Sequence, residues 1–167
     1  MLIIYTGNGK GKTSATVGQA IRATGQGLKV AFAQFMKQEG IAGEQAILAN
    51  ILKDNFFARG AGFFRNEEQR EKHREAALLV LEWAKKKILN VNMLVLDESL
   101  YALDAGLITK QELEDILAVA ETHKVHLVLS GRNMPEWLEK KASIVTEMFE
   151  IKHLHAQGGK ATKGIEY

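Results

Sequence analysis

Five short stretches of the chain are almost continuously apolar, and they limit the fold more than any other feature of the sequence. They span residues 2–6, 29–36, 93–97, 125–130 and 143–148, and residues 55–59 form a shorter sixth candidate. A strand with one face in water alternates apolar and polar residues, whereas a strand covered on both faces does not. The pattern therefore predicts a mostly parallel sheet with helices on both faces.

Helical patterns lie between these strands. Residues 12–25 follow the first strand directly and end in glycine, which commonly terminates a helix. Residues 66–89 have the helical period, with Asn66 and Gln69 in the positions of a capping box and three lysines near the other end. We therefore expect a helix over each of these two segments.

The second half of the chain carries two more helix signals. Thr109 and Glu112 have the spacing of a capping box, and the single proline suits the first turn of a short helix over 135–141. Strands that alternate with helices predict a doubly wound α/β fold of the P-loop NTPase-like kind. We expect one nucleotide-binding domain over residues 1–167, with an extended C-terminal tail from about residue 153.

The composition argues against several classes of protein. Lys and Arg number 22 and Asp and Glu 20, so the formal net charge is +2, which gives no reason to expect a nucleic-acid partner. Cysteine is absent, which excludes disulfides and thiolate metal sites and fits a cytoplasmic location. The sequence shows no signal peptide and no apolar run near the roughly 18 residues of a membrane span, so we expect no membrane association.

The residues between the first strand and the first helix read TGNGKGKTS, at positions 6–14. Glycines let a backbone curl around an anion, and the helix that follows contributes its positive N-terminal end. In such a loop Lys12 reaches phosphate oxygens and the Thr13 hydroxyl is suited to bind Mg²⁺. The usual first glycine is replaced by Thr6, and Lys10 adds a positive charge. The predicted nucleotide-binding residues of the loop are Gly7, Asn8, Gly9, Lys10, Gly11, Lys12, Thr13 and Ser14.

A second element is the apolar strand 93–97, which ends in the carboxylates Asp97 and Glu98. Ligands of open α/β sheets bind beyond the carboxyl ends of the strands, where these side chains arrive. Mg²⁺ prefers oxygen ligands, and successive strand residues point to opposite faces, so we expect only one carboxylate to bind it directly. The predicted metal site is Thr13, Asp97 and Glu98, and the predicted catalytic residues are Lys12, Thr13 and Glu98.

Several segments taken together resemble a known family. They read YTGNGKGKTS (5–14), QFMK (34–37), GAGF (60–63), LVLDES with YAL (94–99 and 101–103), LSGR (129–132), VTEM (145–148) and KATKGIEY (160–167). Their order is similar to that in the P-loop ATP:corrinoid adenosyltransferases, and the resemblance covers almost the whole chain. The GNGKGKT loop and the KGIEY-type ending are its most specific parts.

The resemblance implies an activity. Family members transfer the 5′-deoxyadenosyl group of ATP to the Co(I) of a reduced corrinoid and release triphosphate, in adenosylcobalamin formation. They bind the nucleotide in reverse in the loop, need Mg²⁺ or a similar divalent cation, and are typically cytoplasmic homodimers; a reductase is a further expected partner. Co(I) is itself a strong nucleophile, so the protein needs only to bind, orient and stabilise charge.

The resemblance also assigns residues outside the loop. Phe63 is expected to face the corrinoid, and Arg22 and Arg132 are expected to approach the nucleotide. Arg65 stands where the family usually has a tryptophan, which we expect to change the lower face of the corrinoid pocket. Leu100 stands where it commonly has an asparagine, which we expect to remove a polar contact. The family's covering segment before the first strand is missing from this sequence, so we expect a more open site, or cover from a partner subunit or another element.

Two other functions stay open on the sequence alone. A P-loop ATPase would use Glu98 to polarise water and would release orthophosphate. A nucleotide-dependent delivery protein would hold an adenosylated corrinoid without making it. Two histidine pairs, His123 with His126 and His153 with His155, lack a third ligand at a suitable spacing, so we do not expect a zinc site.

Overall fold

A computed structural model describes residues 1–62, 64–154 and 158–165 of the chain. Within these residues six parallel strands form one sheet in the order β3-β2-β4-β5-β1-β6. The strands are β1 (Leu2–Thr6), β2 (Val30–Gln34), β3 (Phe56–Ala58), β4 (Met93–Asp97), β5 (His126–Ser130) and β6 (Ile144–Glu147). All six strands are therefore confirmed in place, with some ends shortened. The expectation of a strand covered on both faces is wrong for β6, which lies at an edge of the sheet and is exposed along its length.

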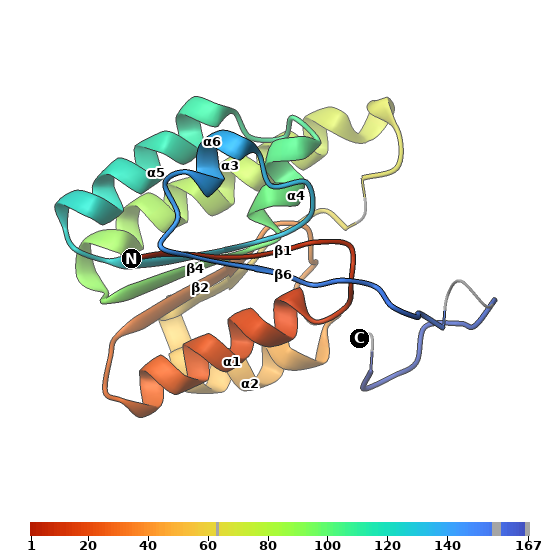
Figure 1. The fold of residues 1–167 in the computed structure, drawn as a ribbon, viewed down its shortest axis with the longest axis horizontal. Coiled ribbons are helices and arrows are strands. Elements are labelled where there is room, and N and C mark those ends of the chain that lie inside the picture. The colour runs from red at the N-terminus through yellow and green to blue at the C-terminus, as the bar shows by residue number, and fades with distance from the viewer. Residues whose placement is uncertain (63, 155–157, 166–167) are drawn as a thin grey trace.

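Helices cover both faces of this sheet (Figure 1). The α-helices are α1 (Lys12–Gly25), α2 (Gly43–Leu52), α3 (Arg70–Lys87), α4 (Ser99–Asp104), α5 (Lys110–Thr122) and α6 (Glu136–Glu139). Helices α1 and α2 lie on one side, and α3, α4, α5 and α6 lie on the other. Short 3₁₀ turns occupy Lys53–Asn55, Glu67–Gln69 and Ile88–Asn90. The doubly wound prediction is confirmed.

Two apolar clusters, one on each face of the sheet, explain the near-continuous apolar strands. Leu94 and Leu96 of β4 join the cluster that includes residues of α3, α5 and α6. Met93 and Val95, the alternate residues of the same strand, join the cluster under α1 and α2. Because successive side chains point to opposite faces, a strand covered on both sides needs apolar residues throughout.

The helix ends show which local signals were correct. Thr109 Oγ1 accepts from the Glu112 N–H at 3.2 Å and Glu112 Oε2 accepts from the Thr109 N–H at 2.8 Å, so that capping box is confirmed. The capping box predicted for Asn66 and Gln69 is wrong. Residues 67–69 form a 3₁₀ turn and α3 begins later, so Gln69 Oε1 accepts from the Arg65 N–H at 3.4 Å instead.

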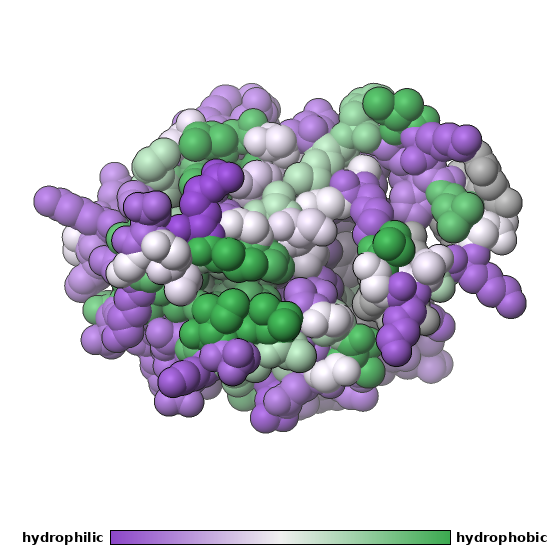
Figure 2. All heavy atoms as spheres, turned by 90° about the horizontal axis from the view of Figure 1, so that it is seen from below, coloured by the Kyte–Doolittle hydropathy of each residue, from purple (hydrophilic) through white to green (hydrophobic). Residues whose placement is uncertain are grey.

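Helix α6 is shorter than the predicted 135–141 at both ends: Pro135 precedes it in an extended conformation with ψ 146°, and residues 140 and 141 form a turn. Helices α2 and α4 were not predicted. Viewed from the α1 and α2 side, the surface mixes apolar and polar patches (Figure 2). In the described part of the chain, no helix combines the length and the apolar character that crossing a membrane requires.

Candidate functional site

Four neighbouring strands end in polar side chains at one edge of the sheet. These residues are Thr6 of β1, Gln34 of β2, Asp97 of β4 and Ser130 of β5, and each is the last residue of its strand. All four are buried, in a molecule whose other strand residues are largely apolar. Polar groups at the carboxyl ends of parallel strands mark the usual ligand edge of an α/β sheet.

Asp97 is the centre of this edge. Its side chain is fully buried and accepts hydrogen bonds from Ser130 Oγ at 2.7 Å and Gln34 Nε2 at 3.1 Å. Thr13 Oγ1 lies 3.2 and 3.1 Å from its two carboxylate oxygens, and Thr16 Oγ1 lies 3.5 Å from Oδ1. A buried carboxylate is tolerated only with such partners. Asp97 thus ties strand β4 to the first turns of α1.

Lys37 supplies the positive charge of the cluster. Its Nζ lies 2.7 Å from Glu44 Oε1, 3.1 Å from Thr13 Oγ1 and 3.4 Å from Asp97 Oδ2. Burial disfavours the ammonium, but Asp97 and Glu44 outweigh it and raise the pKa of Lys37. Gln34 Nε2 also donates to Glu44 Oε1 at 3.0 Å, so the two carboxylates share donors.

Neither Lys37 nor Glu44 was predicted as a site residue. The segment that contains Gln34 and Lys37 carried part of the family resemblance, and that was the available signal. Glu44 had none, because it lies in the first turn of the unpredicted helix α2.

The loop between β1 and α1 begins and ends on glycines whose backbone conformation other residues rarely adopt. Gly7 has φ 94° and Gly11 has φ 113°, both in the left-handed region. Thr6 belongs to β1 and pairs in register with Glu147 of β6. The residue that replaces the usual first glycine is therefore a strand residue, and the loop proper is Gly7–Gly11.

Lys12 turns back into this loop. Its Nζ donates to the carbonyl oxygens of Gly7 at 2.8 Å and Gly9 at 2.7 Å. Burial is the main cause that lowers the pKa of Lys12, and Arg132 adds to the effect. The ammonium is thus held in the loop by weak acceptors, where a phosphate would be a stronger partner.

Glu98 occupies a different position from its neighbour Asp97. Its backbone is left-handed, with φ 60°, and its N–H donates to Ser130 Oγ at 3.0 Å. The side chain is half-buried, and burial together with the charge of Asp97 raises its pKa. Asp97 is the carboxylate that contacts Thr13, as expected for two successive residues with opposite directions.

The residues after β6 pack directly on the loop. The Gly9 N–H donates to the Met148 carbonyl at 2.8 Å, and the Met148 N–H donates to the Thr6 carbonyl at 2.8 Å. A Cβ on Gly9 would lie 2.8 Å from that Met148 oxygen, so this glycine makes room for the 147–150 segment. The Gly9 N–H is therefore committed to this segment and is not a free phosphate donor.

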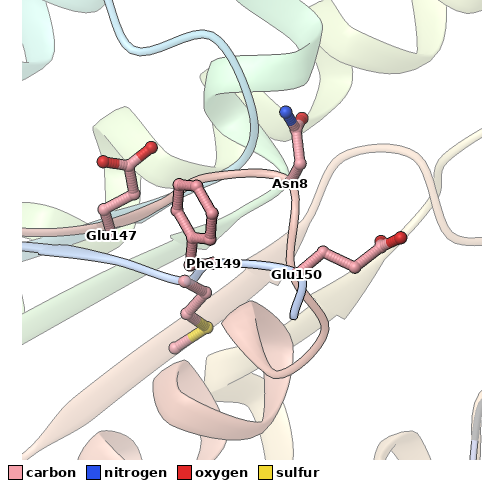
Figure 3. Close-up of a pocket in the computed structure, with 5 residues that line it drawn as sticks. Asn8, Glu147, Phe149 and Glu150 are labelled. Carbon is pink, nitrogen blue, oxygen red and sulfur yellow. The ribbon is translucent and has the colours of Figure 1, made fainter. Parts of the chain in front are cut away.

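A pocket of about 290 Å³ lies where the two segments meet, lined by Asn8 and by residues 147–150. Asn8 comes from the loop, and the other lining residues are Glu147 at the end of β6 and residues 148–150 after it (Figure 3). Two of them are the carboxylates Glu147 and Glu150, which would repel phosphate. We conclude that this pocket is not the triphosphate site, although it adjoins the loop.

Gly9→Ala should disturb the contact between the loop and the 147–150 segment. We expect a loss of about 1–3 kcal/mol in unfolding free energy, the usual cost of overpacking, together with weaker ATP binding. Gly18→Ala is the matched control, because it lies within α1 with no atom near its added Cβ. It should stabilise the protein by about 0.5–1 kcal/mol. Denaturant titration of both variants checks this, and equal effects would contradict it.

The other predicted residues divide into three groups. Arg132 is exposed just after β5, and its charge acts on Lys12 and Glu98, so it belongs to the site. Ser14 and Lys10 are exposed at the loop, and Lys10 Nζ donates to the Ile165 carbonyl at 2.5 Å. Arg22 lies exposed in the last turn of α1, about 15 Å of helix rise from Lys12, so this chain does not bring it to the loop.

The corrinoid-facing prediction, Phe63, lies outside the described residues. Arg65, two residues further along the chain, is exposed. Leu100 is fully buried in the apolar core and packs under Gly131, so its side chain is a core residue. Whether an asparagine at this position would make a polar contact with the site stays a prediction.

The oxygen atoms around Asp97 fit a hard divalent cation. Among the described residues no three His, Cys, Asp or Glu side chains come together as a metal cluster. The Asp97 carboxylate and the Thr13 hydroxyl nevertheless suit Mg²⁺, which commonly uses one or two protein oxygens and completes its shell with phosphate and water.

The glycine loop, its lysine and the buried strand-end aspartate define a P-loop nucleotide-binding protein. The whole chain, residues 1–167, matches the family described as ATP:corrinoid adenosyltransferase BtuR/CobO/CobP, and it belongs to that family.

Curated relatives agree. A corrinoid adenosyltransferase of Sinorhizobium sp is 35% identical over 100% of this chain and 80% of its own length. That of Escherichia coli (strain K12) is 32% identical over 100% of this chain and 85% of its own length. A solved DNA replication initiation factor aligns with 88% of this chain and 39% of its own, at TM-score 0.46 and 15% identity, which is too distant to bear on function.

Proposed function

We propose that this enzyme binds the triphosphate of ATP in the Gly7–Gly11 loop and transfers the 5′-deoxyadenosyl group to the Co(I) of a reduced corrinoid. The cobalt supplies the electron pair of the new Co–C5′ bond, the C5′–O bond breaks, and triphosphate leaves with that bond's electrons. Membership of the family supports the reaction. The observation that carries the site is Thr13, which joins the loop to the buried Asp97.

Charge stabilisation is the task we assign to the loop. Lys12 and the free N–H groups at the start of α1 offset the negative charge that grows on the departing triphosphate. Lys12 is held by two carbonyl oxygens, which it can exchange for phosphate oxygens without a large movement. Glu98 and Arg132, whose charges act on Lys12, would set the orientation of the phosphates at the edge of the sheet.

A divalent cation is part of this proposal. Thr13 and Asp97 are the residues that would hold it, directly or through water, and it would neutralise charge on the triphosphate. No general base is assigned, because the corrinoid brings its own nucleophile.

We also propose a cytoplasmic homodimer, with a reductase as a further partner. The residues after β6 support a contact with a partner, because Phe149, in the pocket beside the loop, is 82% exposed and Ile151, two residues further on, is 95% exposed. Large apolar side chains exposed in this way commonly mark a surface that a partner covers. Phe63 remains the residue proposed to face the corrinoid.

The phosphate product tests the reaction. With ATP, Mg²⁺ and a reduced corrinoid, we expect inorganic triphosphate in amounts that match the corrinoid consumed. Orthophosphate released without corrinoid would favour the P-loop ATPase, with Glu98 polarising water. Tight corrinoid binding with neither product would favour a delivery protein.

A further inference from the structure

The hydroxyl of Thr13 contacts two charged partners in this structure. It donates toward the Asp97 carboxylate and accepts from Lys37 Nζ at 3.1 Å. A metal bound by Thr13 would take a lone pair of the same oxygen. Lys37 therefore occupies one of the two acceptor positions on the oxygen that the proposed metal would bind.

The distances show that the Lys37 ammonium and a metal ion at Thr13 would compete. A Mg²⁺ ion would lie about 2 Å from Thr13 Oγ1. Since Lys37 Nζ is 3.1 Å from that oxygen, the two charges would be separated by at most about 5 Å, the sum of the two distances. Asp97 is the second shared partner, at 3.4 Å from Nζ. A dication and an ammonium so close repel strongly in a half-buried site.

We propose that the Lys37 ammonium is a tethered cation that holds the metal position of the ligand-free enzyme, and that metal binding displaces it from Thr13 and Asp97 onto Glu44. The inference rests on the proposed metal site at Thr13 and Asp97. It adds a residue that keeps the buried carboxylate neutralised between turnovers and sets how tightly metal binds.

Two features favour displacement over a fixed ion pair. The shortest contact of Nζ, 2.7 Å, is with Glu44, which lies on α2 and can keep the ammonium after the other contacts break. The Lys37 side chain is 27% exposed, whereas that of Asp97 is fully buried. Lys37 therefore has room to move and Asp97 does not. Gln34 holds both carboxylates in place during the exchange, through hydrogen bonds of 3.0 and 3.1 Å.

Mn²⁺ binding to the full chain without nucleotide tests the proposal, with free Mn²⁺ measured by electron paramagnetic resonance. Lys37→Met should tighten Mn²⁺ binding about tenfold, the scale of removing one neighbouring charge from a partly exposed site. Lys37→Arg, which keeps the charge, should stay close to the wild-type Kd. Lys85→Met removes the same charge from an exposed position on α3 and should leave the Kd unchanged.

Thermal unfolding gives a second readout. Lys37→Met leaves Asp97 without its cation, so its Tm should fall, and saturating Mn²⁺ should restore most of that fall while shifting the wild type less. A Lys37→Met variant with wild-type Mn²⁺ affinity and no recovery of Tm would overturn the proposal.

Thr13→Val separates this inference from the metal site on which it rests. Added to Lys37→Met, it should abolish the gain in Mn²⁺ affinity. If Thr13→Val weakens binding while Lys37→Met changes nothing, the metal site stands and the role of Lys37 is wrong. If the gain in Mn²⁺ affinity survives Thr13→Val, the metal binds elsewhere, and both the proposed metal site and the role of Lys37 are wrong.

Discussion

Lys12→Met should lower kcat for adenosyl transfer by about 10²–10³, the usual effect of removing one group that stabilises developing charge. The Lys12 ammonium lies inside the loop, 2.8 and 2.7 Å from the carbonyl oxygens of Gly7 and Gly9. When ATP is bound, the ammonium is proposed to exchange these carbonyl oxygens for phosphate oxygens, where it offsets the charge of the leaving triphosphate. ATP affinity should fall less than kcat, because that charge is greatest when the C5′–O bond breaks.

Single-turnover rates of cobalt–carbon bond formation measure this effect apart from product release. Lys85→Met, which removes an exposed lysine far from the loop in sequence, serves as the charge-matched control and should keep the wild-type rate. A Lys12→Met enzyme that binds ATP and transfers the adenosyl group at the wild-type rate would show that the ammonium has no part in catalysis.

Asp97→Ala should be the most destabilising single substitution at the site. It removes the shared acceptor of Ser130 and Thr13 and leaves the charge of Lys37 with one partner fewer. Breaking one side of a buried charged pair typically costs about 3–5 kcal/mol. Asp97→Asn keeps an acceptor of the same shape, so it should cost less stability while still weakening metal binding.

Glu98→Gln is the control for that experiment. Glu98 is the neighbour of Asp97, and the substitution leaves its left-handed backbone in place. Burial and the charge of Asp97 raise the pKa of Glu98, so folding disfavours its ionised form at neutral pH. Its replacement should be neutral or slightly stabilising. Denaturant titrations at pH 7 compare the three variants. Equal losses of unfolding free energy for Asp97→Ala and Glu98→Gln would contradict the role of Asp97 as the shared acceptor of the site.

The strands were the most predictable part of the fold. Each was a short apolar run, and the structure buries β2, β4 and most of β5 and β1. Helix α2 escaped prediction because its apolar residues do not mark a single face. Leu48 and Leu52 are buried, but Ile47 and Ile51 are exposed, and the polar Gln45 is buried. Gln45 is buried because it donates to Gln34 and Gln38, a tertiary reason that no local pattern contains.

The site divides in the same way. Lys12, Thr13 and Asp97 were predictable from their motifs, and the structure brings the last two into contact. Lys37 and Glu44 were missed, because their contacts depend on β2 lying beside β4 in the sheet and on the unpredicted helix α2. The motif also gave the wrong reason for Gly9, whose need for a small side chain comes from a segment almost 140 residues away in the chain.

The formation of a cobalt–carbon bond tests the central claim most directly. The protein is incubated anaerobically with ATP, Mg²⁺ and chemically reduced cobalamin, and the optical spectrum is followed before and after illumination. The account predicts a light-sensitive alkylcobalt product that appears only when ATP is present. Absence of that product, under conditions where ATP binding is demonstrated, would contradict it.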